Sequence, residues 1–303
     1  MTTTTQVPPP DQQAALFSSK PSRRARKIGG EPLPVVTVRY IVLFLMFLLM
    51  AGPFLYQLST SLKGPDEDIF SYPPTLIPQS PTLDNYAAVG EAIPVWRYIS
   101  NSLIVSVASV VTNCVLAAMA GYALARLRFR FKGVAFAAFL ATVIIPFEVI
   151  MVSVFLTIRG LGLVDTLTGV VLPTAVTGLS ILLMYNAFLA LPLSIEEAAV
   201  LDGASVWQRF RHISLPSVRG TLTVVAIFSF MFAWDEFLWP LIVLKSPENF
   251  TLTVGIQYLS GTFTSDQRVI SAGTMIAVIP LLVAFFALQR FFFRGVGEGG
   301  VKG

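Results

Sequence analysis

The sequence predicts an all-α membrane protein with six transmembrane helices. Hydrophobic residues make up 54% of the 303 residues and charged residues make up 13%, about half the share that soluble domains carry. Several apolar stretches reach roughly twenty residues, the length that a helix needs to cross the hydrocarbon core of a bilayer. Because backbone polar groups in lipid must pair with one another, we expect these stretches to be helices.

The apolar stretches divide the chain into a tail and a membrane domain. Residues 1–34 are rich in Thr, Pro, Gln and Ser, a composition typical of disorder, and residues 35–303 form the membrane domain. The expected spans are residues 40–58, 99–125, 134–158, 167–190, 221–244 and 269–288. Several spans contain proline, which membrane helices tolerate as kinks. These prolines are Pro53, Pro146, Pro173, Pro240 and Pro280.

Lys and Arg residues are distributed unevenly between the two sides of this topology. Sixteen of the 21 lie in the two termini and in the loops after the second and fourth spans. Because positively charged loops stay on the cytoplasmic side, we expect both termini and the loop 191–219 in the cytoplasm. Basic residues at span ends also argue against nucleic-acid binding. On the outer side, the acidic, proline-rich loop 60–98 fits a solvated cap and a partner surface equally well, and residues 253–260 are expected to form a short surface helix.

Several kinds of chemistry lack the residues that they need. The sequence has no G-x-x-x-x-G-K-[ST] motif, so we expect no P-loop for ATP. Cys114 is the single cysteine and His212 is the single histidine, and no group of ligands has the spacing of a metal site. A nucleophile elbow is also missing. We therefore expect no catalytic residue, no cofactor and no metal on this chain.

The loop 191–219 carries the signals of two short helices joined by a turn. Ser194 followed by Glu197 fits a capping box, in which both side chains satisfy free N–H groups at a helix start. Ser205 followed by Gln208 fits a second capping box. These two starts predict a compact helical knob between the fourth and fifth spans.

The ends and the apolar face of this knob are also predicted. Gly203 suits the left-handed position that ends a helix, and Pro216 is expected to end the second helix. The apolar face of the second helix is expected to insert into a groove of a partner. This face comprises Val206, Phe210 and Ile213, with Trp207 nearby.

The letters of this loop form a recognisable pattern. E-A-A-x-x-D-G-A runs from Glu197 to Ala204, and F-x-x-I-x-L-P runs from Phe210 to Pro216. At this spacing and place, the pattern resembles the loop by which membrane subunits of bacterial ABC importers grip their ATPase subunits. Further stretches resemble the carbohydrate branch of that family over residues 36–303. They are Thr82–Tyr86, Asn101-Ser102, Gly121–Arg126 (G-Y-A-x-A-R), Gly162–Thr166, Leu172-Pro173, Ala233–Leu238 (W-N-[DE]-F, with Asp235 where Asn is usual) and Gly299–Gly303.

The resemblance implies a fold, a function and partners. It implies the type I ABC importer permease fold with cytoplasmic coupling helices, in a maltose-type second permease subunit of a bacterial inner or plasma membrane. The cargo would be an oligosaccharide or a related polyol or glycerol derivative. The implied partners are a second homologous permease subunit, two ATPase subunits that hold ATP and Mg, and an extracytoplasmic sugar-binding protein. The ATPase contact would lie in loop 194–216, at Glu196, Glu197, Ala198, Ala199, Asp202, Gly203, Ala204, Trp207, Phe210, Ile213 and Pro216.

Polar residues inside the spans are candidates for a sugar path. A charge at the bilayer centre costs at least roughly 2.5–3.5 kcal/mol, so such residues usually face a bundle interior or a watery cavity. They could line a path by accepting hydroxyl hydrogen bonds and stacking on a sugar ring, or they could be structural. The candidates are Glu148, Trp234, Asp235, Glu236 and Trp239. The alternative function is a self-sufficient ion-coupled transporter that uses the three carboxylates as proton sites; an intramembrane hydrolase lacks its nucleophile.

Overall fold

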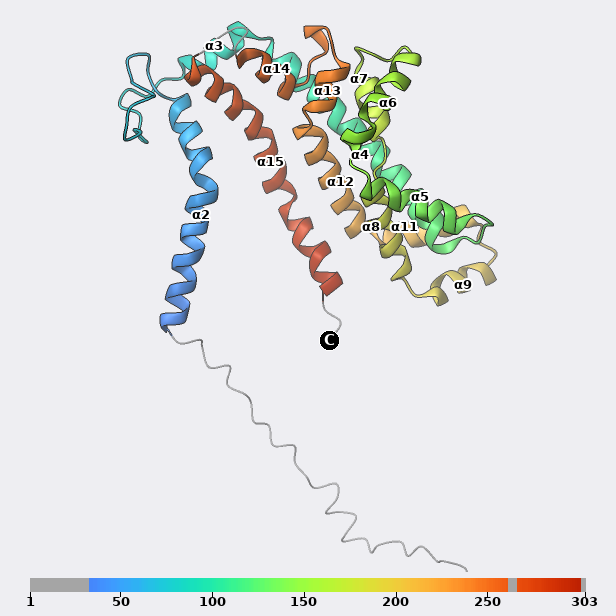
Figure 1. Ribbon diagram of the computed structural model, residues 1–303. Helices are drawn as coiled ribbons and strands as arrows, with labels where there is room; N and C mark the ends of the chain where they lie inside the picture. Colours follow the sequence, from blue (N-terminus) through green and yellow to red (C-terminus); the bar gives the residue numbers. More distant parts are fainter. Residues whose placement is uncertain (1–32, 261–265, 301–303) are drawn as a thin grey trace, which may run out of the picture. The chain divides into compact units, whose positions relative to one another are not determined.

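The computed structural model describes residues 33–260 and 266–300, and every regular element in these two ranges is a helix (Figure 1). Most of the tail 1–34 and the C-terminal residues 301–303 lie outside the described residues, as does the resemblance of Gly299–Gly303 in large part. The long helices are α2 (Leu33–Ser61), α4 (Val95–Arg126), α12 (Arg219–Asp235) and α15 (Gln267–Gly300). The shorter helices outside the loop 191–219 are α3 (Asp84–Ala92), α5 (Lys132–Ile144), α6 (Phe147–Gly160), α7 (Leu167–Val171), η1 (Leu172–Thr174), α8 (Gly178–Leu189), α13 (Leu238–Val243), η3 (Pro247–Asn249) and α14 (Leu252–Tyr258).

The chain forms two compact units, residues 1–53 and 54–303. The described part of the first unit is most of α2, whose apolar side chains are exposed along its length. An apolar helix of this length suits contact with lipid. Pro53 lies inside α2 without ending it, as expected.

Within the described residues, three helices are long and apolar enough to cross a membrane as single elements, and up to six spans result if each bent helix pair counts as one. The single helices are Pro34–Ser61, Val95–Arg126 and Gln267–Phe286. The bent pairs are Lys132–Ile144 with Phe147–Gly160 (107°), Leu167–Thr174 with Gly178–Leu189 (46°) and Val206–Ser217 with Arg219–Asp235 (78°).

The expectation of a kinked helix at Pro146 was wrong, because the helix is interrupted there. Ile145 is extended (φ −82°, ψ 115°) and α6 starts after Pro146 at an angle of 107° to α5. Proline lacks an N–H and forces the preceding residue out of the helical region. The expected fifth span is also divided, into α12 and α13, at an extended Glu236.

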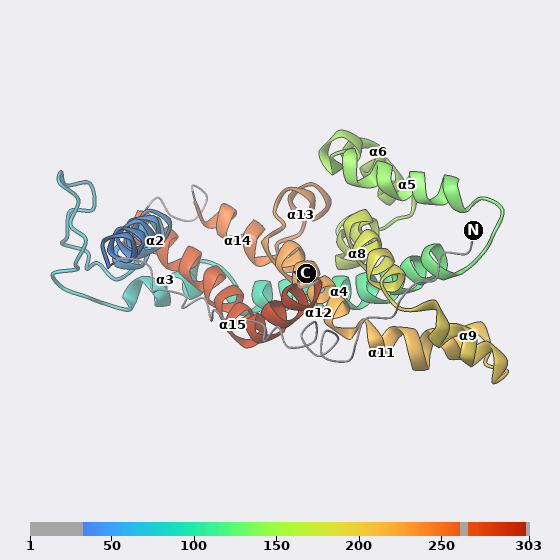
Figure 2. The ribbon, with the colours of Figure 1, turned by 90° about the horizontal axis from the view of Figure 1, so that it is seen from below.

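The second unit is organised around α4, which packs along α8 and α12. Two clusters of buried side chains lie along α4. One surrounds Tyr98 and Trp239 near α14, and the other surrounds Tyr122 and Phe188 near the loop that follows α8. Figures 1 and 2 place α9 and α11 at the end of this unit away from α3 and α14. The expected short helix at 253–260 is confirmed as α14.

A closed loop follows α2 in the second unit. The Glu67 carboxylate accepts hydrogen bonds from the N–H groups of Gly64, Gln79 and Ser80, at 3.2, 3.0 and 2.9 Å. These bonds hold the pKa of Glu67 at about 2, below its ordinary value of 4.5, because they favour the charged form. Residues 64–80 therefore form a folded cap rather than an extended segment.

Candidate functional site

The knob between α8 and α12 is built from short helices. They are α9 (Leu193–Leu201), α10 (Val206–Gln208), the π-helix η2 (Arg209–Ser214) and α11 (Leu215–Ser217). Gly203 has a φ of +78° and its N–H bonds to Val200 O at 3.0 Å. The expected left-handed turn at Gly203 is therefore confirmed.

Of the two expected capping boxes, one is present. The Ser205 Oγ accepts from Gln208 N at 3.3 Å, and Gln208 Oε1 accepts from Ser205 N at 2.8 Å. The box at Ser194 was wrong: α9 begins at Leu193, after Pro192, and has no side-chain cap bond. The fixed φ of Pro192 leads directly into the helix, so Ser194 lies inside the first turn.

The second helix of the knob does not end at Pro216, contrary to expectation. It continues through α11 to Ser217, and α12 then starts at 78° to it. The π-helical turn before Pro216 widens the helix, and such a turn accommodates the missing N–H of proline without a break. The bend at Val218 separates the knob from the span that follows.

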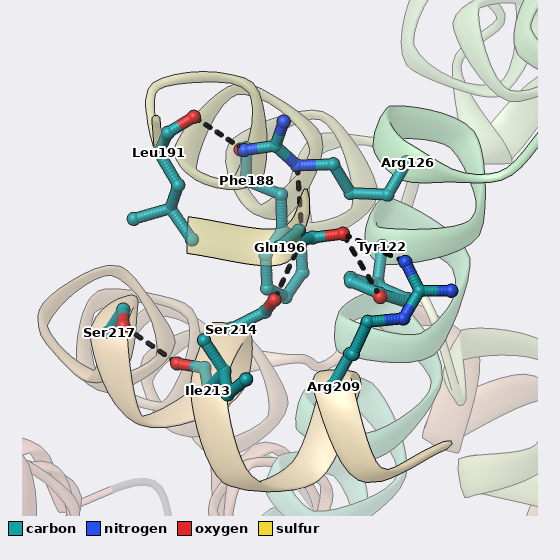
Figure 3. Close-up of polar contacts among 9 residues, drawn as sticks. All are labelled: Tyr122, Arg126, Phe188, Leu191, Glu196, Arg209, Ile213, Ser214 and Ser217. Atoms are coloured by element: carbon teal, nitrogen blue, oxygen red, sulfur yellow. Dashed lines mark hydrogen bonds and ion pairs between the residues drawn. The ribbon is translucent and has the colours of Figure 1, made fainter. Parts of the chain in front are cut away.

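The carboxylate of Glu196 is the polar centre of the knob (Figure 3). Glu196 is only 6% exposed. Its Oε1 lies 3.3 Å from Arg126 Nε and accepts from Ser214 Oγ at 2.9 Å. Its Oε2 lies 3.7 Å from Arg209 Nη1 and accepts from Tyr122 OH at 3.4 Å. A buried charge is costly unless it is paired and hydrogen-bonded, and four partners meet that condition here.

Arg126 connects three segments of the chain. Its Nη2 donates to Phe188 O at 2.5 Å and to Leu191 O at 2.6 Å, at the C-terminal end of α8. Cationic side chains are favoured at free helix carbonyls. Through its Nε it also faces Glu196 in α9. One guanidinium therefore joins the last turn of α4, the end of α8 and the first helix of the knob.

A cluster of aromatic rings packs next to this polar centre. The Tyr122 ring lies 5.4 Å from Phe188 and 5.1 Å from Phe210, and Trp207 lies 5.3 Å from Phe210 between ring centroids. Phe210 is 6% exposed, whereas Trp207 is 55% exposed. The expectation that Phe210 enters a partner's groove is therefore corrected: Phe210 packs inside this chain, and Trp207 remains on the surface.

The expected ATPase-contact residues thus fall into two groups. Glu196, Ala199 and Phe210 are buried, so in this conformation they do not present a surface to a partner. Ala204 and Ile213 are partly buried, and the exposed members are Glu197, Ala198, Asp202, Gly203, Trp207 and Pro216. A shallow cavity of about 280 Å³ lies on this exposed side and is lined by Asp202, Gly203, Ala204, Gln208, His212 and Ile213.

The five residues expected to line the sugar path do not all lie together. Trp239 is fully buried, its indole N–H donates to Val170 O at 3.2 Å, and Phe147 packs edge-on against it. No face of Trp239 is free for a sugar in this conformation. Glu236 Oε1 accepts from Trp239 N at 3.1 Å. Glu148 is exposed in the first turn of α6.

The other two path residues lie together. Trp234 and Asp235, at the end of α12, both line a cavity of about 330 Å³. The Trp234 indole N–H donates to Ala277 O at 3.1 Å. The structure therefore brings two of the five candidates to one cavity and leaves Glu148, Glu236 and Trp239 elsewhere.

Comparison with known proteins decides the family of this chain. The family model for the binding-protein-dependent transport system inner membrane component matches residues 113–298. The chain belongs to this family. The permease is 34% identical to the arabinooligosaccharides transport system permease protein AraQ of Halalkalibacterium halodurans, over 75% of this chain and 81% of that protein. It is 34% identical to the inner membrane ABC transporter permease protein YcjP of Escherichia coli, over 87% and 95% of the two chains. It is also 30% identical to the diacetylchitobiose uptake system permease protein DasC of Streptomyces coelicolor, over 92% and 99%.

The fold of the permease matches a solved structure. A chain of a bacterial ABC transporter for import of the acidic polysaccharide alginate superposes with a TM-score of 0.75 and 23% identity, over 85% of this chain and 96% of that one. This likeness establishes the ABC importer permease fold that the sequence predicted. The family match and the sugar permeases among the relatives do not favour the ion-coupled alternative.

Sequence reasoning missed several residues that organise the knob of this permease. Tyr122 and Arg126 belong to the G-Y-A-x-A-R stretch, which carried the resemblance but was given no role. That stretch was the available signal, because an arginine at the end of a span needs acceptors. Arg209 and Ser214 had no such signal, since only packing brings them to Glu196.

Proposed function

We propose that this permease is one membrane-spanning subunit of an ATP-driven, binding-protein-dependent importer of a neutral oligosaccharide or a related polyol derivative. The curated relatives named above include permeases for arabinooligosaccharides and diacetylchitobiose, which supports a sugar as cargo. The chain itself performs no catalysis in this proposal. ATP and Mg are held and hydrolysed on two separate ATPase subunits, and a second permease subunit forms the other half of the path.

The observation that carries the coupling role is the anchored knob. Its exposed residues, among them Glu197, Asp202 and Trp207, stand on a buried base in which Glu196 contacts Arg126. A rigid element that joins α9 to α4 and α8 transmits a displacement of the knob to both helices, because packed cores deform little. We infer that the ATPase subunits grip the exposed side and move the spans through this base.

The proposal includes an orientation. The knob and both termini face the cytoplasm, and α3, α13 and α14 face the external sugar-binding protein. The excess of Lys and Arg in the termini and in two loops supports this orientation. It also places the folded cap at 64–80 outside the cell.

Reconstitution tests the proposal. The permease, its second permease, the ATPase and the binding protein are assembled in proteoliposomes, and uptake of labelled arabinotriose, lactose and diacetylchitobiose is measured with ATP inside. We expect ATP-dependent uptake of at least one of these sugars, and none when the ATPase is omitted. Uptake by this chain alone, driven by a proton gradient, would overturn the proposal in favour of the ion-coupled alternative.

A further inference from the structure

A cavity of about 330 Å³ lies where α12 ends against α14 and α15. Its walls are mainly apolar, with Phe237 and Ile256 among them, and four side chains add polar atoms. The four polar side chains are Asp235, Thr253, Gln257 and Thr274. Apolar walls with a few placed polar groups are typical of sites for small molecules.

The α14 side of this cavity is held firmly in place. Leu252 N donates to Ser102 Oγ at 2.8 Å, and Thr253 Oγ1 donates to Glu236 O at 2.9 Å. Gly255 lies so close to Tyr98 that a Cβ at this position would be 2.1 Å from Tyr98 Cδ2. Because α14 is fixed to α4 and to the end of α12, its backbone is already ordered before a ligand binds.

Asp235 and Gln257 offer free polar groups to this cavity. Both side chains are exposed, and neither forms a hydrogen bond or ion pair with another residue in the described part of the chain. The hydroxyl hydrogens of Thr253 and Thr274 are used by Glu236 O and Ile270 O. The cavity therefore presents carboxylate, amide and hydroxyl oxygens as acceptors, and the Gln257 amide as its free donor.

This set of groups discriminates by charge. A sugar hydroxyl can donate to the Asp235 carboxylate and accept from Gln257, and a protonated amine can pair with Asp235. A carboxylate or sulfonate would face Asp235, and the lining residues that the structure describes include no Lys or Arg. Like charges at close range repel, so an anionic sugar unit would be disfavoured next to Asp235.

We propose that this cavity is a binding subsite for a neutral or amino-bearing sugar unit, and that Asp235 excludes anionic units from it. This inference rests on the proposed function, since it names the class of sugar that the permease accepts. It adds Gln257 and Thr274 to the residues that contact the cargo, and it gives Asp235 a role in specificity rather than in proton transfer.

Thiol labelling of the complete reconstituted transporter tests the charge of the cavity. In a Cys114→Ser background, Gln257→Cys is reacted with a trimethylammonium methanethiosulfonate and with the sulfonate reagent of the same length. We expect the cationic reagent to react about tenfold faster, relative to the two rates with free cysteine, as a single nearby charge predicts. Asp235→Asn should abolish that preference. If the two reagents already react equally fast with Gln257→Cys while Asp235 is present, relative to free cysteine, the role of Asp235 is overturned.

Protection by sugar tests occupancy of the cavity. A probe sugar that the same vesicles take up, arabinotriose, lactose or diacetylchitobiose, should slow labelling of Gln257→Cys. Ser260→Cys is the matched control, because Ser260 is exposed just beyond α14 and does not line the cavity. Uptake without protection at Gln257, or equal protection at Ser260, would overturn the subsite while leaving the proposed function intact. Absence of ATP-dependent uptake of all three sugars would count against the proposed function. The ratio of the labelling rates of the two reagents would still decide the charge of the cavity.

Discussion

The Glu196 carboxylate lies 3.3 Å from Nε of Arg126, and both side chains are shielded from solvent. Glu197, the next residue, points about 100° away around the same helix and is exposed. Two adjacent glutamates in α9 therefore have different environments. One holds the knob to α4 and α8, and the other is free to contact a partner.

The two glutamates are expected to respond differently to the same substitution. Glu196→Gln removes the charge that compensates Arg126 and Arg209, and losing one member of a buried ion pair costs about 3–5 kcal/mol. We expect a lower melting temperature in detergent, measured by intrinsic fluorescence. Glu197→Gln is the matched control: it should leave the melting temperature unchanged and weaken ATPase binding in pull-down. Equal melting temperatures for both variants would contradict the anchoring role of Glu196.

Two aromatic residues of the knob should also separate stability from binding. Phe210→Ala empties a buried site between Tyr122 and Phe188 and should cost about 3–5 kcal/mol. Trp207→Ala removes a side chain that is 55% exposed, so it should change stability little. We expect Trp207→Ala to reduce ATPase binding measured by surface plasmon resonance. The prediction fails if Trp207→Ala retains full affinity for the ATPase.

A left-handed glycine in the knob is expected to be essential for coupling. Gly203→Val places a β-branched residue at a φ of +78°, a strain of roughly 1–2 kcal/mol for a residue with a Cβ. Uptake and ATPase binding should be lost while the protein still inserts in the membrane. Gly162→Val provides the control, because Gly162 has a φ of +71° with equally open space around it but lies in the loop after α6. It should show similar strain and retain ATPase binding; loss of binding in both variants would point to general misfolding.

Acid should open the folded cap at 64–80. The pKa of Glu67 is lowered to about 2 from 4.5, so its carboxylate stabilises the cap above the unfolded pKa, and that contribution is lost as pH falls toward 2. We expect hydrogen exchange at Gln79 and Ser80, corrected for intrinsic rates, to accelerate between pH 4.5 and 2. In Glu67→Gln the exchange should already be fast at pH 6, and Asp66→Asn, an exposed neighbour, should behave as the wild type. Protection from hydrogen exchange that does not change with pH in the wild type would contradict this role of Glu67.

Glu148, one of the three carboxylates in the expected spans, distinguishes the two transport mechanisms. Glu148 is exposed in the first turn of α6. In an ATP-driven permease Glu148→Gln keeps the shape and the hydrogen-bonding capacity, so we expect it to retain most uptake. A proton relay would not tolerate the amide. Uptake of labelled sugar is measured with and without a protonophore while ATP is maintained. A dead Glu148→Gln variant, together with collapse of wild-type uptake under the protonophore, would support the ion-coupled alternative instead.

Several features of this permease were predictable because they depend on local chemistry. Apolar length and the lack of water in lipid determine that the spans are helices. The turn at Gly203 and the cap at Ser205 with Gln208 each depend on residues within a few positions of one another. The order of residues in the knob was also sufficient to indicate the family that the comparisons established.

Tertiary packing alone decided which side chains face inward. Successive residues of a helix point about 100° apart, so adjacent side chains such as Glu196 and Glu197 can have opposite environments, and both are plausible surface residues in the sequence. Contacts from Arg126 and Ser214, which are distant in the sequence, bury Glu196 rather than Glu197. In the same way, Phe188 and Tyr122 bury Phe210 and leave Trp207 outside. The enclosure of Trp239 likewise depends on Phe147 and Val170, which come from distant parts of the chain.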